Sequence, residues 1–336
     1  MILLRVDMKT LSYMLATLLV FVLLGCGAPP ELQQSGQKQV VEDKTELVIL
    51  HDVSLSRSFE ELAPSFEKSH PTIKVRLEGA AGMLVARKVS DVGRKADIVA
   101  VTDFRTIQRV LLPKLCEWYV CFALDEMVIA YTQQSNRREK MEKRNWFRVL
   151  TEKDVTMGLA SPATDPCGYR TLMVFQLAEL FYRSKIRGRA ISEILQNPPR
   201  KPVIRPTTLA LLPLLQTGTI DYLFTYRSVA EQHNLMYVRL KELLNLSAPR
   251  LVRYYGRVKV NIPPTETSKS ARELRGEPIV YAFTVLKESK HLKEARLFAD
   301  YLIGPKGAEV LAKSHQQVIR GGRIGFTSTG QPMLGE

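Results

Sequence analysis

An aspartate, a proline, a cysteine and a glycine follow one another where a predicted strand gives way to a predicted helix. They lie in the stretch SPATDPCGYRTLM, residues 161–173, and the helix is expected to begin near Gly168. Asp165 suits a helix cap, because Pro166 follows it at a position where a missing amide hydrogen costs nothing. A carboxylate at this point can also face a ligand, and the residues alone leave both interpretations open.

Cys167, in the same stretch, is the residue to consider as a catalytic nucleophile. A thiol near a helix N-terminus has a lowered pKa and can act as a nucleophile. No base can be assigned to it, because His51 and His233 are only loosely placed and the five histidines show no H-x-x-x-H spacing. We therefore predict that the chain is not an enzyme and that it has no resident cofactor and no zinc site.

Three further loops have the same character, since each follows a predicted strand and opens a predicted helix. They are HDVSLS at 51–56, LEGAAGM at 77–83 and AVTDF at 100–104. The first amides of a helix lack internal partners and carry partial positive charge, so they favour anions. Ser54 can add a hydroxyl donor, although a serine before a helix is usually only its cap. Four such loops facing one cleft would surround a small ligand.

The hydrophobic pattern predicts an α/β fold with mostly parallel sheets. Short apolar or alternating runs indicate strands at 46–52, 72–79, 96–101, 126–132, 155–162, 220–226 and 277–287, and helical periodicity fills several of the intervals. Two α/β units with a strand running between them suggest two lobes and a ligand cleft. We assign 46–126 with 276–322 to the first lobe, 127–275 to the second, and 323–336 to a loose tail.

The N-terminus is typical of an export signal. Arg5 and Lys9 lead into an apolar run of about 14 residues, too short to span a bilayer as a helix. Leu23-Leu24-Gly25-Cys26 resembles a bacterial lipobox, after which Cys26 would be lipidated. A cleaved, unanchored signal is the alternative, and Met8 is a second candidate start. Residues 27–45 are polar and are expected to form a flexible tether.

We therefore expect an exported protein, lipid-anchored at the cell envelope, in the periplasm or on the outer face of the cytoplasmic membrane. The net charge is +14, from 48 basic and 34 acidic residues, and the basic residues are dispersed. Such a distribution favours an acidic membrane surface or small anions over nucleic acid. Cys116 and Cys121 either pair as a disulfide or remain small buried groups.

Four motifs in order along the chain resemble the tungstate/molybdate-binding proteins of ABC importers. They are ADIVAVTDF, DPCGYRTLM, IDYLFTYRSVAEQHNL and GEPIVYAFTVLK, and the similarity covers about 46–322. The resemblance implies a two-lobed solute-binding fold of type II and a monomer that delivers an oxyanion to a membrane permease. It also implies closure of the lobes by hinges, for which the strands at 123–131 and 277–283 are candidates.

The resemblance assigns Asp165 a role, because the aspartate of this motif gives a carboxylate oxygen to the metal centre of the oxyanion. Tungsten and molybdenum can expand from four to six oxygen neighbours, whereas sulfur and phosphorus do so less readily. A carboxylate therefore admits the first pair and rejects sulfate or phosphate. The residues expected around the ligand are Ser54, Gly82, Met83, Asp165, Cys167, Gly168, Thr208 and Tyr226.

Three positions depart from the family pattern. Thr208 stands where the family has a second carboxylate ligand, a glutamate, and Pro213 interrupts the helix that would carry it. Met83 replaces a hydroxyl residue, and Asp52 adds bulk and negative charge where glycine is usual. These changes leave an alternative open: a diverged receptor for another small anion or organic ligand, or a lipoprotein that senses or binds a partner.

Two arginines are candidates for balancing the charge of an anion. Arg170 follows the aspartate motif, and Arg205 precedes Thr208. Each is as readily interpreted as a solvated surface group.

Overall fold

The computed structural model describes residues 44–141, 146–262 and 271–326. The predicted export signal, the lipidation site at Cys26 and nearly all of the tether lie outside the described residues. Within those ranges, no helix combines the length and the apolar character needed to cross a membrane.

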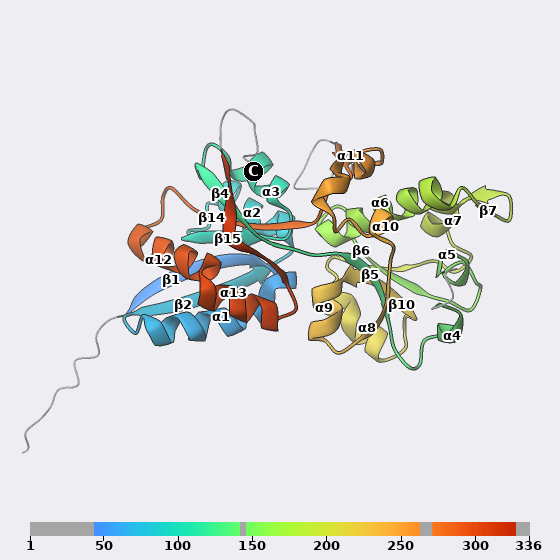
Figure 1. Cartoon of the computed structure of the whole chain (residues 1–336), viewed down its shortest axis with the longest axis horizontal. Helices are drawn as coiled ribbons and strands as arrows, with labels where there is room; N and C mark the ends of the chain where they lie inside the picture. Colours follow the sequence, from blue (N-terminus) through green and yellow to red (C-terminus); the bar gives the residue numbers. More distant parts are fainter. Residues whose placement is uncertain (1–43, 142–145, 263–270, 327–336) are drawn as a thin grey trace, which may run out of the picture. The chain divides into compact units, whose positions relative to one another are not determined.

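The larger sheet has six strands, drawn from the first third of the described chain and from its end (Figure 1). Strand β1 is parallel to its neighbours β2 and β3, whereas β14 is antiparallel to β3 and β4, and β15 to β4. In spatial order the strands are β15 (Gln317–Phe326), β4 (Trp118–Leu124), β14 (Val280–Val285), β3 (Ile98–Val101), β1 (Thr45–Asp52) and β2 (Ile73–Ala80).

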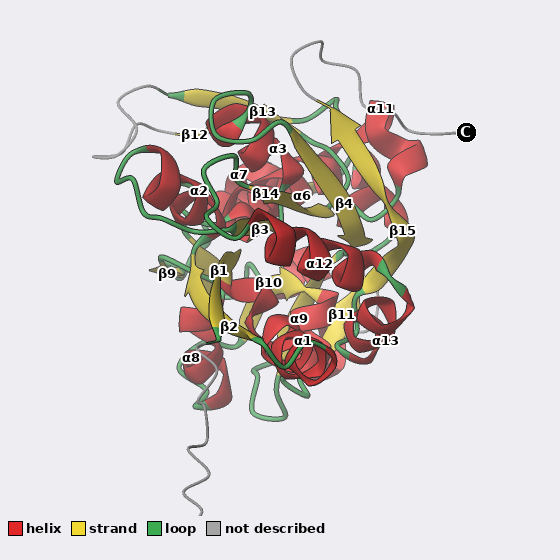
Figure 2. Cartoon of the chain, turned by 90° about the vertical axis from the view of Figure 1, so that its left-hand side faces the viewer, coloured by secondary structure: helices red, strands yellow, loops and turns green. Residues whose placement is uncertain are grey.

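Helices cover both faces of this sheet, because β1 is apolar on both sides. Leu47 and Ile49 pack in the cluster that contains residues of α1 (Ser56–Ser69) and α12 (Leu292–Ile303). Leu50 points the other way, into the cluster formed with α2 (Gly82–Ser90). Figure 2 shows α12 lying across the sheet, with α1 and α13 (Pro305–Lys313) beside one another. The alternation of side chains along a strand accounts for this division.

The second sheet has five strands, all from the middle of the chain. Strand β6 is parallel to β9 and β10, while β5 is antiparallel to β10 and β11. In spatial order the strands are β11 (Met236–Arg239), β5 (Met127–Tyr131), β10 (Tyr222–Tyr226), β6 (Met157–Ala160) and β9 (Val203–Arg205).

The remaining elements are mostly short helices around the second sheet (Figure 1). Two small ribbons pair β7 (Lys185–Ile186) with β8 (Arg189–Ala190) and β12 (Lys259–Ile262) with β13 (Arg272–Arg275). The helices are α3 (Phe104–Thr106), α4 (Arg138–Met141), α5 (Trp146–Val149), α6 (Pro166–Tyr182), α7 (Ile191–Gln196), α8 (Leu212–Gln216), α9 (Arg227–Gln232), α10 (Glu242–Asn245) and α11 (Val252–Tyr255), with single 3-10 or π turns at Val53–Leu55, Ile107–Leu111, Leu209–Leu211 and Pro249–Leu251.

The sheets are more evenly mixed than the sequence predicted. Strands β14 and β15 join the larger sheet late in the chain and pair antiparallel with earlier strands. A buried strand has the same apolar pattern in either direction, so composition could not reveal this. Strand β15 also continues to Phe326, past the predicted start of the loose tail at 323. The boundaries of the two lobes stay a prediction.

Candidate functional site

Helix α6 begins with the cap that the motif around Asp165 predicted. Asp165 has an extended backbone, and its Oδ1 accepts a hydrogen bond of 2.8 Å from the Cys167 amide, with Pro166 in the first turn. A Cβ on Gly168 would lie 2.5 Å from the Ala160 carbonyl oxygen at the end of β6. Only glycine therefore lets α6 approach the strand this closely.

The second oxygen of Asp165 is held from another segment. Its Oδ2 accepts 2.7 Å and 3.1 Å hydrogen bonds from the amide and the hydroxyl of Thr208, which is fully buried. The resemblance led us to expect Thr208 at the position of a family glutamate, and that placement stays a prediction. In the structure Thr208 supports the carboxylate of Asp165.

Asp52 occupies a corresponding place at the end of β1. Its Oδ1 accepts a 2.9 Å hydrogen bond from the Ser54 amide, and its Oδ2 accepts 2.8 Å from the Thr102 hydroxyl at the end of β3. The side chain is only 1% exposed. Sequence reasoning treated Asp52 as an intrusion of bulk and charge and did not single out Thr102. No local pattern indicates that these two residues, 50 positions apart, meet.

Gly82, the first residue of α2, shows that the loops converge. A Cβ built there would lie 2.2 Å from Asp52 Oδ2 and 3.4 Å from Pro166 Cγ. The ends of β1 and β3 and the starts of α2 and α6 therefore meet, as the sequence analysis proposed for four ligand-facing loops. Strands β1 and β3 belong to the larger sheet, and α2 packs on them. Helix α6 packs instead on β6 and β10 of the second sheet.

The charge of Asp52 affects the ionisation of Asp165. Burial raises the pKa of both Asp52 and Asp165, and the negative charge of Asp52 helps to bring the pKa of Asp165 to about 6. Their hydrogen-bond donors are neutral amides and hydroxyls. These donors lower both pKa values but supply no compensating full charge.

Arg170 settles one question that the sequence left open. It is buried, and its Nη1 donates to the Thr102 carbonyl at 3.0 Å and to the Tyr226 hydroxyl at 2.6 Å. It thereby joins α6 to both sheets and holds Tyr226, the tyrosine predicted near the ligand. Arg205, by contrast, is exposed.

Ser54 and Met83 are two further predicted residues, in the turn after β1 and in the first turn of α2. Ser54 and Met83 are buried, and Arg272 Nη1 lies 3.5 Å from Met83 Sδ. The Ser54 side chain is buried beside the Asp52 carboxylate, which also accepts a hydrogen bond from the Ser54 amide. Its contact with a ligand stays a prediction.

The sequence analysis considered a reactive thiol at Cys167 as an alternative, and the surroundings of Cys167 contradict it. Burial raises the pKa of Cys167 well above its usual range, and the nearby Asp165 charge adds to the effect. The thiol donates to the Phe224 carbonyl at 3.4 Å, so it is a packed structural group despite its place in the first turn of α6. Cys116 and Cys121 are thiols rather than a disulfide.

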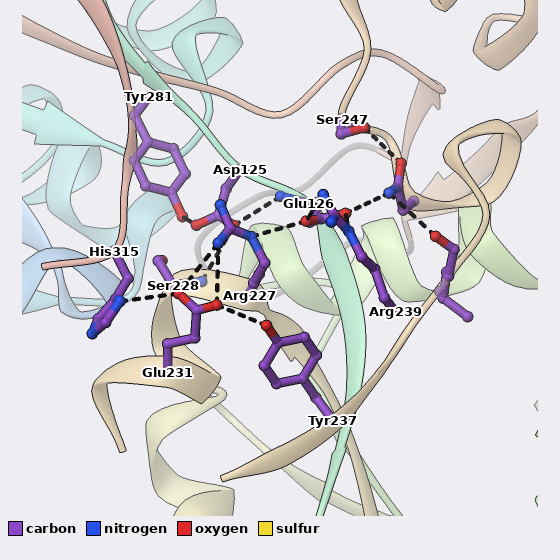
Figure 3. A network of polar contacts seen from close by, with 12 residues as sticks. Asp125, Glu126, Arg227, Ser228, Glu231, Tyr237, Arg239, Ser247, Tyr281 and His315 are labelled. Carbon is purple, nitrogen blue, oxygen red and sulfur yellow. Dashed lines mark hydrogen bonds and ion pairs between the residues drawn. The ribbon is translucent and has the colours of Figure 1, made fainter. Parts of the chain in front are cut away.

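A second group of buried acids lies at the crossover from β4 to β5 (Figure 3). Asp125 accepts 2.8 Å hydrogen bonds from the Tyr281 hydroxyl and the Glu126 amide. Glu126 forms ion pairs of 2.8 Å with Arg227 and 2.9 Å with Arg239. Both strands that the sequence analysis named as hinge candidates therefore share this network, through Asp125 and Tyr281.

The same network continues outward to the turn before β15 (Figure 3). Glu231 contacts Arg227 at 3.1 Å, accepts 2.7 Å from the Tyr237 hydroxyl, and lies 3.1 Å from His315 Nδ1. Positive side chains thus meet Glu126 and Glu231, which distinguishes this network from Asp52 and Asp165.

Comparisons with known proteins agree with this architecture. The family of bacterial extracellular solute-binding proteins matches residues 47–315. A molybdate/tungstate-binding protein of Pyrococcus abyssi is 35% identical over 324 residues, covering 90% of this chain and 91% of the relative. A solute-binding protein of Petrotoga mobilis is 34% identical over 285 residues, covering 84% of this chain and 87% of the relative.

Two solved structures are similar in fold at low sequence identity. The periplasmic molybdate-binding protein of Azotobacter vinelandii has a TM-score of 0.56 at 14% identity, over 82% of this chain and 100% of the other. A sulfate-binding protein of Mycobacterium tuberculosis has a TM-score of 0.57 at 15% identity, over 82% and 87%. The fold is thus shared by receptors for different anions, and this chain belongs to the family of bacterial extracellular solute-binding proteins.

Proposed function

We propose that this solute-binding protein captures molybdate or tungstate and delivers it to the membrane permease of an ABC importer. The similarity to the Pyrococcus abyssi protein supports this ligand, because it extends over nearly the full length of both chains. The similarity in fold does not distinguish among anions, since a sulfate-binding protein is as close in structure. The choice of ligand therefore depends on the residues of the site.

The observation that carries the proposal is the buried carboxylate of Asp165. It is 2% exposed, and the amides of Cys167 and Thr208 hold both of its oxygens. A fixed carboxylate repels an ordinary dianion such as sulfate but can donate an oxygen lone pair to molybdenum or tungsten. Ser54, Tyr226 and the amides of α2 and α6 complete the ligand-binding set that we propose, with Gly82, Met83, Gly168 and Thr208 shaping it.

The cellular setting follows from the sequence predictions. We propose export through the N-terminal signal, lipid anchoring at Cys26, and a monomer that closes two lobes on its ligand. The crossover at Asp125 and Glu126 is the hinge in this scheme. Binding needs no chemistry from Cys167, in keeping with its burial.

Calorimetric titration of the full chain in mild detergent tests the proposal directly. Tungstate and molybdate should bind with submicromolar affinity, sulfate should give no heat, and Asp165→Ala should abolish the signal. Arg205→Ala, which removes an exposed side chain near Thr208, is the matched control and should bind as the wild type does. Absence of binding for both metal oxyanions in the wild type would contradict the proposal.

A receptor for a different small ligand is the second candidate. Thr208 and Met83 at altered family positions favour it, because both reduce the polar contacts expected for an oxyanion. Thermal stabilisation measured across a panel of small anions and organic acids would identify such a ligand, since binding to the native state alone must raise the melting temperature.

A further inference from the structure

An arginine of the small β12–β13 ribbon reaches the first turn of α2. Strand β13 lies close to α2 (Figure 2), and Arg272 Nη1 is 3.5 Å from Met83 Sδ. Met83 follows Gly82, and a Cβ built on Gly82 would lie 2.2 Å from Asp52 Oδ2 and 3.4 Å from Pro166 Cγ. Arg272 therefore contacts the helix turn at which the loops of the proposed site converge.

Arg272 has hydrogen-bonding capacity that the chain does not use. The residue is partly buried, and its Nε is buried without a hydrogen-bond partner among the described residues. The thioether of Met83 is only a weak acceptor, so its contact with Nη1 recovers little of the hydration that a guanidinium loses on burial. Arginine is well suited to bind oxyanions, because it presents several donors in one plane. The side chain therefore has donors available for an anionic ligand.

Two further arginines surround Arg272 with positive charge. Arg87 lies one turn after Met83 on the same face of α2, and Arg109 belongs to the turn at Ile107–Leu111, which packs on α2. Burial, followed by the positive charges of Arg87 and Arg109, lowers the pKa of Arg272. No carboxylate of the described residues is among the charges that shift this pKa. We call Arg87, Arg109 and Arg272 the arginine cluster.

Two acids next to the arginine cluster are already engaged. Asp103 and Glu277 line a small depression that Arg109 also lines. The two carboxylate oxygens of Glu277 accept hydrogen bonds of 2.7 Å and 2.8 Å from Arg105, and Asp103 accepts one from the Tyr169 hydroxyl. These contacts leave an excess of positive charge at this edge of the site, which favours a negative ligand.

We propose that Arg272 is a cationic contact for the oxyanion at the edge of the site, and that it attracts dianions without distinguishing among them. This inference rests on the function proposed above and adds a residue to it. Asp165 discriminates among anions by their central atom, whereas the arginine cluster acts on their charge alone. The cluster offsets the repulsion that a dianion meets from the buried acids Asp52 and Asp165.

Arg272→Gln is the informative variant, because it removes the charge and keeps a polar side chain. Arg272→Lys keeps the charge and loses the planar guanidinium, so it separates attraction of the anion from packing against Met83. Lys259→Gln is the matched control. It removes one positive charge from β12 of the same ribbon, where Lys259 is exposed and pairs with Glu273 at 2.8 Å.

Calorimetric titration of the full chain in mild detergent with tungstate and with molybdate measures this role. At about 20 mM salt, Arg272→Gln should weaken the binding of both anions by the same factor, about fivefold to tenfold. At about 300 mM salt the factor should shrink, because mobile ions screen the charge. Arg272→Lys should recover most of the lost affinity, and Lys259→Gln should match the wild type at both salt concentrations.

Three results would overturn the role of Arg272 and leave the proposed function standing. They are unchanged affinity in Arg272→Gln, an equal loss of affinity in Arg272→Gln and Arg272→Lys, and a loss confined to one of the two anions. Wild-type affinity that does not change with salt would also overturn it, and that measurement does not depend on the folding of a variant. A wild type that binds neither anion would overturn the proposed function and this inference together.

Discussion

Glu126 at the β4–β5 crossover and the strand-end acids Asp52 and Asp165 are all buried, yet they meet different partners. At the crossover, Glu126 is paired with Arg227 and Arg239, and Asp125 accepts from Tyr281 (Figure 3). At the strand ends, Asp52 and Asp165 accept hydrogen bonds from amides and hydroxyls, and the charge of Asp52 helps to raise the pKa of Asp165.

We infer that this difference separates a structural network from the proposed binding site. Opposite charges at the crossover compensate the cost of burying Glu126, so nothing further is needed there. The pair at the strand ends retains an unfavourable interaction that a suitable ligand can reverse. Perturbed titration combined with uncompensated charge is typical of functional sites. Four predictions test this contrast.

Removing the acid at the crossover should have the largest effect. Glu126→Ala leaves the partly buried Arg227 without its closest partner and removes an acceptor for Asn245. The free energy of unfolding should fall by about 3 kcal/mol, the low end of the range for a broken buried pair, because Arg227 keeps its ion pair with Glu231. Urea denaturation measures this change.

Glu309→Ala is the control, because it breaks only an exposed pair with Lys313. It should leave the unfolding free energy nearly unchanged. Equal losses of unfolding free energy in Glu126→Ala and Glu309→Ala would mean that the crossover network contributes no more to stability than a surface ion pair.

The carboxylate pair should make the protein more stable in mild acid. The pKa of Asp165 is raised to about 6, so the folded protein holds this proton more tightly than the unfolded chain does. Stability from this group is therefore fully present below about pH 4 and is lost as pH rises through about 6. A shift of about two pKa units corresponds to about 3 kcal/mol.

Urea denaturation of the wild type and Asp165→Asn across this pH range measures the effect. The wild type should gain stability relative to the variant on acidification, in protein without added ligand. A difference in unfolding free energy between the wild type and Asp165→Asn that stays constant with pH would contradict the raised pKa of Asp165.

Neutralising Asp52 should stabilise the protein without added ligand near pH 7.5. Asp52→Asn relieves the repulsion on Asp165, and we expect a gain of about 1–2 kcal/mol in unfolding free energy. Asp97→Asn provides the comparison, since Asp97 is a buried acid outside the site that accepts from an amide and a hydroxyl and lies 3.5 Å from His291 Nδ1. A loss of stability in Asp52→Asn as large as that in Asp97→Asn would indicate that Asp52 is structural.

The smallest effect is expected for the hydroxyl that joins the two predicted hinge strands. Tyr281→Phe removes one of the donors to Asp125, which keeps those from the Glu126 and Ser228 amides. We expect a loss of about 1 kcal/mol in thermal or urea denaturation. Tyr301→Phe, which loses a less buried contact with Ser65, should cost less. A larger loss of stability in Tyr301→Phe than in Tyr281→Phe would mean that the buried crossover contact contributes no more to stability than the less buried one.

Much of the fold could be predicted because strand and helix patterns are local. The runs at β1, β3, β10 and β14 were placed correctly from their apolar residues. The antiparallel pairing of β14 and β15 could not be, since strand direction depends on where the chain re-enters the sheet. The continuation of β15 to Phe326 also depends on its partner β4 and not on its glycine-rich sequence.

The sequence by itself determined the start of α6, because Asp165, Pro166, Cys167 and Gly168 act within one turn of helix. Only the tertiary structure decided that Thr208 serves Asp165, that Arg170 is buried, and that Asp52 joins the site. A cap depends on neighbours two residues apart, whereas these contacts require strands and helices from distant parts of the chain to pack together. Burial and the approach of a second charge then change the chemistry of residues whose types alone were ambiguous.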